Sequence, residues 1–231
     1  MKRGIRGKIL ALGTLAAGTF GLYLSSAQYA AAAEAADISN VNESIRVDSG
    51  QQAGNVSTVN GSIHIGDNAV VKLVHTTNGG VNLGSRATAD QVSTTNGTIH
   101  VGDGAQVHGP VRSTNGSLHL GDNANVAGDL TNTNGGIRVQ AAHVAGSIDT
   151  SSGGIDLGPN ARIDGGIRVE KDNSWHFGSD KPPDVIIRPG TVVKGTLHFE
   201  RTVTLYVSDR ATIGRVEGAE IHKFSGDNPP N

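Results

Sequence analysis

The chain lacks cysteine and has few aromatic or charged residues. With no cysteine among 231 residues, it can form no disulfide, no thiolate metal site and no lipid-bearing cysteine. Aromatic residues make up 3% and charged residues 17% of the chain, and no aromatic lies between Asp37 and Ser174. The sequence also has no nucleophile elbow, phosphate loop or metal-hydrolase motif. We therefore expect a protein that is not an enzyme, needs no cofactor, and is held together by its core and its backbone hydrogen bonds.

Residues 1–33 are typical of a signal peptide for export. A basic start with four Lys and Arg residues precedes an apolar stretch, and small residues offer a cleavage site near Ala32 and Ala33. The alternative is an uncleaved anchor, because residues 9–33 carry no charge and are long enough to span a bilayer. The weakly hydrophobic second half of this stretch favours cleavage, which would leave no membrane span.

Cleavage would make the mature chain acidic. Four of the 19 Lys and Arg residues lie in the leader, which leaves 15 against 21 Asp and Glu, a net charge of about −6. This balance argues against nucleic acid and against an anionic membrane surface as partners.

Seven copies of one short pattern occupy most of the remaining chain. Successive copies begin 18 or 19 residues apart, and a fixed period near 20 is the signature of a solenoid. Their first residues are Asn42, Asn60, Asn78, Asn96, Asn115, Asn134 and Ser152. In one copy, residues 99–101 alternate apolar, polar and apolar, as in a half-buried strand. Turn signals flank this strand at Asn96-Gly97, where both residues tolerate positive φ, and at residues 102–104.

These features predict an all-β fold, a parallel β-helix with coils of 18 to 19 residues and three short sides per coil. Right-handed winding is the default for parallel crossovers and is our expectation here. Regular repeats should span residues 37–169, irregular coils with an aromatic C-terminal cap residues 170–224, and a loose tail residues 225–231. The residues expected in this cap, or in end-to-end assembly through it, are Trp175, Phe177, Phe199, Tyr206 and Phe224.

Stacked coils should place equivalent residues in ladders along the solenoid. An asparagine ladder, with each amide bonded to the next, is expected for Asn60, Asn78, Asn96, Asn115 and Asn134. Asp67, Asp103 and Asp122 are expected to cap their own turns. Two Thr and Ser columns precede the asparagines, and a flat face of this kind could bind ice or a sugar surface. They are Thr58, Thr76, Thr94, Ser113 and Thr150 in one column, and Thr77, Thr95, Thr114 and Thr133 in the other.

The histidines are the candidates for a metal or pH-sensitive site. His64, His100, His119 and His176 should share one outward column, with His100 and His119 on adjacent coils about 5 Å apart. Two imidazoles at that distance could share a metal, although no third ligand is evident. The alternative is a solvated polar face with no metal bound.

The repeated (V/T)NG(S/T/G)IxI unit behind an export leader resembles exported repeat proteins of Gram-negative bacteria. It is similar to the adhesin-like β-solenoid family and, more distantly, to bactofilins. The resemblance covers Asp37 to about Ala219 and implies a solenoid, with no catalytic residue to carry over. Bactofilins polymerise end to end through hydrophobic terminal coils without nucleotide. They are typically cytoplasmic, whereas this chain has an export leader.

We therefore expect an exported structural or interaction protein of the cell envelope, in the periplasm or at the surface of a Gram-negative bacterium. It would be a scaffold or adhesin-like protein, with itself, envelope components or glycans as partners, and self-assembly is one expectation. The alternative is a glycan- or metal-binding module that uses the Thr or His ladders. A β-helical carbohydrate-active enzyme, with a cleft near Trp175 and His198, has the least support.

Overall fold

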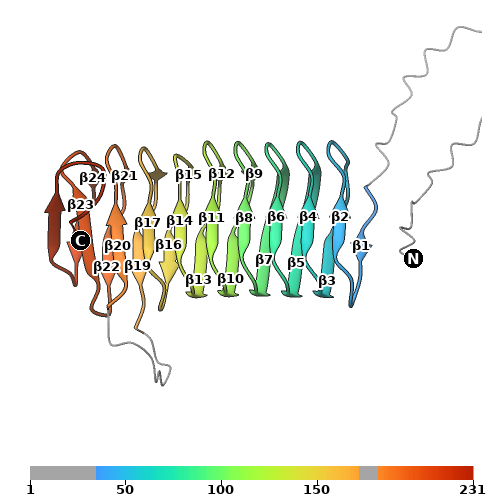
Figure 1. Cartoon of the computed structure of the whole chain (residues 1–231), viewed down its shortest axis with the longest axis horizontal. Coiled ribbons are helices and arrows are strands. Elements are labelled where there is room, and N and C mark those ends of the chain that lie inside the picture. The colour runs from blue at the N-terminus through green and yellow to red at the C-terminus, as the bar shows by residue number, and fades with distance from the viewer. Residues whose placement is uncertain (1–34, 172–181, 231) are drawn as a thin grey trace, which may run out of the picture. The chain divides into compact units, whose positions relative to one another are not determined.

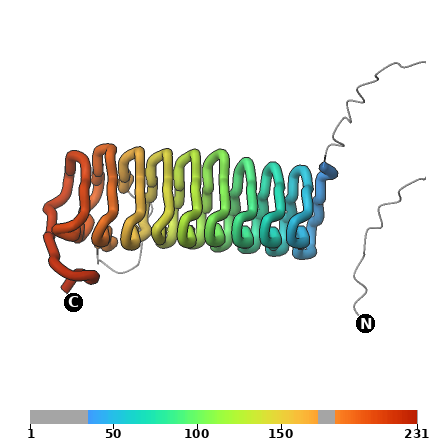
Figure 2. The backbone as a smooth tube through the Cα atoms, turned by 90° about the horizontal axis from the view of Figure 1, so that it is seen from above, coloured from blue at the N-terminus to red at the C-terminus, as the bar shows by residue number. Residues whose placement is uncertain are grey.

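The computed structural model describes residues 35–171 and 182–230, in which it shows 26 strands and no helix. The strands form one 16-stranded and one 10-stranded sheet with parallel pairing. Figures 1 and 2 show the successive coils side by side. The predicted all-β parallel solenoid is therefore confirmed. The predicted leader and residues Trp175, His176 and Phe177 lie outside the described ranges. Within those ranges, no helix is suited to crossing a membrane.

Each coil contributes to three sides, as predicted. Side 1 is the 10-stranded sheet, formed by β2 (Ile45–Val47), β4 (Ile63–Ile65), β6 (Val81–Leu83), β8 (Ile99–Val101), β11 (Leu118–Leu120), β14 (Ile137–Val139), β17 (Ile155–Leu157), β20 (Asp184–Ile187), β23 (Thr204–Ser208) and β26 (Ile221–Phe224). Side 2 comprises β9 (Gln106–Val107), β12 (Asn125–Val126), β15 (His143–Val144), β18 (Arg162–Ile163), β21 (Val192–Val193) and β24 (Thr212–Ile213). Side 3 comprises β1 (Ile38–Ser39), β3 (Val56–Asn60), β10 (Val111–Asn115), β13 (Leu130–Asn134), β16 (Ile148–Thr150), β19 (Ile167–Val169), β22 (Leu197–Phe199) and β25 (Val216–Glu217). Two longer strands, β5 (Val70–Asn78) and β7 (Thr88–Asn96), run through sides 2 and 3 without a break.

The core is a stack of aliphatic layers, one per coil. In β8 the side chains of Ile99 and Val101 are fully buried, while His100 between them is exposed. These residues pair in register with the equivalent positions of β6 and β11, so the same inward positions recur at every level. Burying one Val, Leu or Ile side chain stabilises a fold by about 1.5–3 kcal/mol. The repeated layers therefore stabilise the solenoid without disulfides.

The coil length first increases from 18 to 19 residues at the corner between sides 2 and 3. Ala89 pairs with Val107, whereas Val92 pairs with Val111, so the second pairing spans one more residue than the first. The additional residue thus lies between Val107 and Val111, where the chain passes through Pro110. From this coil on, sides 2 and 3 are formed by separate strands, first β9 and β10 and then β12 and β13.

The two main turns use their glycines differently. Left-handed residues recur at the turn between sides 1 and 2, at Gly50, Asn68, Arg86, Gly104, Asn123, Asn160 and Gly190. At the Asn-Gly corner, Gly116 and Gly135 adopt positive φ, whereas Asn96 and Gly97 do not. Close approach explains this glycine instead, because a Cβ on Gly97 would overlap the carbonyl oxygen of Gly79 in the preceding coil.

The coils after residue 170 vary in length but keep the ladders in register. Ile155 pairs with Val185 across a coil that is much longer than the regular repeat and includes residues 172–181. The next pairings on side 1 join Val185 to Leu205 and then Leu205 to Ile221, so the last of these coils is the shorter one. Of the aromatic residues expected in the cap, Phe199 and Phe224 are buried and Tyr206 is half-buried.

The C-terminal tail is held, whereas the sequence predicted it to be loose. Arg188 donates to the backbone oxygen of Asp227 over 3.1 Å and to the side-chain oxygen of Asn228 over 2.6 Å. Arg210 forms an ion pair of 2.9 Å with Asp227. Both arginines lie at the turn that follows side 1, so the tail folds back along that corner. No local sequence pattern predicts these contacts between the arginines and the tail.

The close approach of successive coils at the Asn-Gly corner gives a stability prediction. We expect Gly97→Ala to lower the free energy of unfolding by about 3 kcal/mol, since the added methyl group meets a backbone oxygen that cannot rotate away. Gly136→Ala is the control, because its Cβ would lie 3.6 Å from the nearest atom. Urea unfolding of both variants measures the difference. Equal losses would contradict the role of close approach.

Candidate functional site

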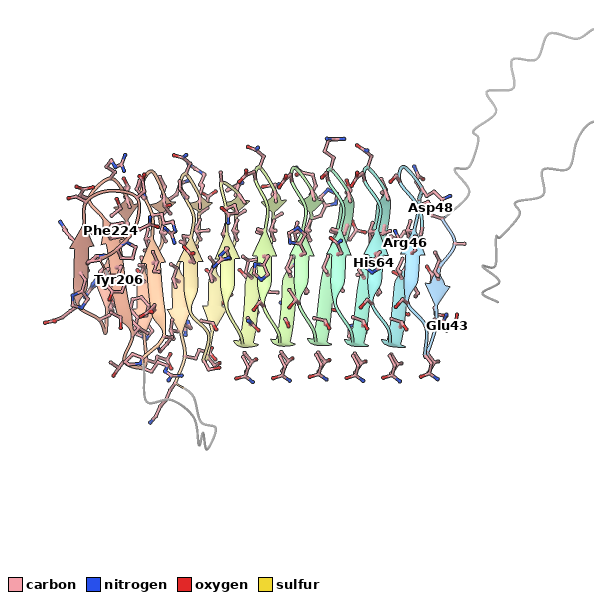
Figure 3. All side chains as sticks on the ribbon, viewed as in Figure 1. Glu43, Arg46, Asp48, His64, Tyr206 and Phe224 are labelled. Carbon is pink, nitrogen blue, oxygen red and sulfur yellow. The ribbon has the colours of Figure 1, made fainter. Side chains whose placement is uncertain are left out.

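The asparagines of the predicted ladder form a hydrogen-bonded row along one corner of the solenoid. Each side-chain N–H donates to the side-chain oxygen one coil earlier over 2.8–2.9 Å, from Asn134 back to Asn42. Ser152 continues the row by donating to Asn134 over 2.7 Å. Figure 3 shows a regular row of side chains at this corner, which begins beside Glu43. The row is solvent-accessible rather than inside the coil.

Each amide in this row retains hydrogen-bonding capacity. A carboxamide has two N–H donors and an oxygen with two lone pairs. The ladder uses one donor and one acceptor of an interior member such as Asn96, which bonds to Asn78 and Asn115. One donor and one acceptor are left for solvent or a ligand at each coil. Because both neighbours hold the amide, its orientation is fixed before anything binds.

The two Thr columns lie on opposite faces of the backbone, so the prediction of one polar Thr face was wrong in part. The column that contains Thr58, Thr76 and Thr94 is buried. These hydroxyls donate over 2.8–3.0 Å to the corner carbonyls of Glu43, Gly61 and Gly79. The second column, Thr77, Thr95, Thr114 and Thr133, is exposed or half-exposed beside the asparagines. Only this second column can contact a ligand.

The exposed Thr and Asn columns belong to a strip without charged residues. Five successive coils each contribute four residues to it, all of them Asn, Gly, Thr, Ser or Val. We call this strip the Asn edge; it comprises residues 59–62, 77–80, 95–98, 114–117 and 133–136. Its donors and acceptors therefore repeat at a spacing of about 4.8 Å along the coil axis.

The histidine column lies on side 1, one face away. Arg46, His64, Asn82, His100, His119 and Arg138 occupy one outward position of successive strands. Figure 3 shows Arg46 and His64 next to each other on this face. Burial, followed by the charge of Arg138 and then His100, lowers the pKa of His119. Among residues 35–171 and 182–230, no group of three or more His, Asp or Glu side chains is placed to hold a metal. The proposed metal pair thus has no third ligand in this part of the chain.

The turn aspartates connect coils and do not cap their own turns, contrary to the prediction. Asp67 accepts a hydrogen bond of 2.8 Å from the backbone N–H of Ser85, and Asp103 one of 2.9 Å from that of Asp122. In both cases the donor is one coil further along the chain. The aspartates therefore add a side-chain bond to the backbone pairing at this turn.

His198 lies in a shallow open groove on side 3, near the position suggested for an enzymatic cleft. The charged residues that line it are Asp129, Asp149, Arg168, Glu170, His198 and Glu217. Burial and then the charge of Asp129 raise the pKa of Asp149, to which Glu170 also contributes. His198 is 3.1 Å from Glu217, and Arg168 is 3.7 Å from Glu200. Charged groups thus pair with one another in and beside this groove, whereas the Asn edge carries no charged group.

No family model matches this chain, and no curated protein or solved structure matches it either. The candidate site therefore rests on its own geometry.

The two Thr columns give a matched pair of substitutions. Thr76→Val keeps the shape of a fully buried side chain but removes its 2.8 Å bond to Gly61, so we expect a loss of about 1–3 kcal/mol of stability. Thr77→Val, one residue along on the exposed face, should change stability by less than about 0.5 kcal/mol. Thermal unfolding compares the two. A larger effect at Thr77 would contradict the assignment of the buried column.

Asp164 on side 2 predicts how stability depends on pH. It lies 2.9 Å from His143 and 3.0 Å from both Arg162 and Lys194. Hydrogen bonds with His143 and then Lys194 lower its pKa from 3.8 to about 2. Because the pKa is lower in the folded state, the carboxylate stabilises the fold fully above about pH 4, and this contribution is lost as the pH falls toward 2.

Asp164→Asn should therefore lower the melting temperature at neutral pH. The difference from the unmodified protein should shrink between pH 4 and pH 2, as followed by circular dichroism. A difference that stays constant over this range would show that the charge of Asp164 does not act in this way.

Proposed function

We propose that this chain is an exported, non-enzymatic scaffold of the cell envelope, with the Asn edge as its binding surface for neutral glycans. It would act as an adhesin-like protein in the periplasm or at the surface of a Gram-negative bacterium. The observation that carries the proposal is the uncharged, solvent-accessible row of amides, each fixed by its neighbours. The predicted leader and the resemblance of the repeat to exported proteins support export, and the sequence contains no catalytic motif.

The chemistry of the Asn edge suits a neutral sugar polymer. Sugar hydroxyls both donate and accept hydrogen bonds, as do the free donor and acceptor of each amide and the hydroxyls of Thr95 and Thr114 beside them. No charge on the strip has to be desolvated when a neutral ligand binds. Because the groups are held in place before binding, little side-chain entropy is lost. The step of one coil is also similar to the length of one sugar unit in an extended glycan.

A second candidate, metal binding by His100 and His119, has no observation in its favour beyond their adjacent positions. A charge introduced on the Asn edge would weaken glycan binding but would not change metal binding by His100 and His119. Such a variant therefore distinguishes the two functions.

We expect the protein to bind at least one neutral polysaccharide in a panel of glucans and chitin, measured by co-sedimentation and calorimetry. Binding should resist added salt, because no ion pair contributes. The double variant Thr95→Lys and Thr114→Lys should reduce affinity at least about tenfold, since each lysine adds a hydrated charge to the strip. His100→Lys, with the same change on side 1, should bind normally.

Three results would contradict the proposal. They are retention of acidic polysaccharides only, equal loss of binding in His100→Lys, and no binding to any neutral polysaccharide by the folded protein.

A further inference from the structure

The last coil leaves the C-terminal layer of the core open. Strands β24, β25 and β26 each pair, among the described residues, with one neighbouring strand only. Ile221 on β26 is 41% exposed, whereas Leu205, its partner in the preceding coil, is fully buried. Ile213 and Val216 are likewise only partly buried. An open sheet edge above an apolar layer is a template for adding another strand, and hence another solenoid.

A lysine occupies a core column at this open end. The register pairs Lys223 with Val207, and the column continues back through aliphatic residues on every strand of side 1. In order they are Val47, Ile65, Leu83, Val101, Leu120, Val139, Leu157, Ile187 and Val207. Lys223 is exposed on β26, the last strand of side 1, while Phe224 beside it is buried. The position therefore tolerates a charge at the last coil and would not tolerate one in any earlier coil.

Stacking of a second copy on this end would bury the lysine. The first coil of that copy would add β2 to β26 in the register of side 1 and set an aliphatic residue, Val47, against Lys223. The nearest acidic residues of that coil, Glu43 and Asp48, flank β2 outside the column, as Figure 3 shows. An ammonium group buried without a partner is strongly destabilising. Arg215, Glu217 and Glu220 add further charge to the same edge.

We propose that Lys223 closes the C-terminal end to a second copy of the chain, so that the solenoid stays at the length its own repeats set. Natural β proteins protect exposed edges with charged residues in the same manner, lysine in particular. The proposal concerns the end of the solenoid and does not depend on what the Asn edge binds. The end-to-end assembly expected from the sequence would then require the loss of this charge.

The test uses light scattering on the purified protein over a hundredfold concentration range. The unmodified protein should show one mass throughout. Lys223→Val should form species whose mass increases with concentration, because a full aliphatic column is now presented at an open edge. Lys223→Met, which keeps the side-chain length without the charge, should behave in the same way. His222→Val is the matched control, since it adds an apolar residue to the same strand in the outward column.

A further substitution shows whether growth is head to tail. Ile38 lies at the opposite end on β1, in the column that ends at Val216, so Ile38→Lys added to Lys223→Val should restore a single mass. The proposal is overturned if the unmodified protein grows, or if neither lysine variant grows while circular dichroism shows that it is folded. Equal growth of His222→Val, or growth that persists in the double variant, would equally overturn it.

Discussion

The structure depends on how closely successive coils approach at the Asn-Gly corner. There the backbone of one coil meets the carbonyl oxygen of the previous one at a distance that leaves no room for a Cβ, as at Gly79 and Gly97. The same carbonyls accept the hydroxyls of buried threonines from inside the coil. Outside, the equal spacing brings the asparagine amides within hydrogen-bond distance of each other. The glycine column, the buried threonines and the exposed ladder are therefore consequences of one repeat distance.

The repeat period made the architecture predictable, but it did not determine which face each corner residue occupies. Alternation in segments such as residues 99–101 predicted the strands of side 1 and their buried residues. Thr76 and Thr77 look equivalent in sequence, yet one is buried and the other partly exposed, because a single residue of register separates inside from outside. For the same reason, the exposed Thr column could be identified as part of the candidate site only from the structure.

The remaining differences involve partners that are distant in sequence. Each turn aspartate bonds one coil ahead, and Arg188 reaches the C-terminal tail across the last coils. Local turn preferences describe short-range contacts only, so they predicted self-capping aspartates and a loose tail. The core position of Lys223 could not be predicted from the sequence either. The segment Ile221–Phe224 has the pattern of an ordinary strand, and only its register with the preceding strands places Lys223 in a core column.

Charge is distributed unevenly along the solenoid, which under our two proposals would separate the binding surface from the end that controls assembly. The Asn edge is free of charge over five coils, whereas the last coil carries four charged residues between Arg215 and Lys223. An uncharged, regular edge suits a neutral polymer, whose affinity increases with the number of coils in contact. Such an edge has a defined length only if the solenoid does not extend by stacking. A charge in the final core column would supply that limit, and the number of repeats encoded in the chain would then set the length of ligand that it contacts.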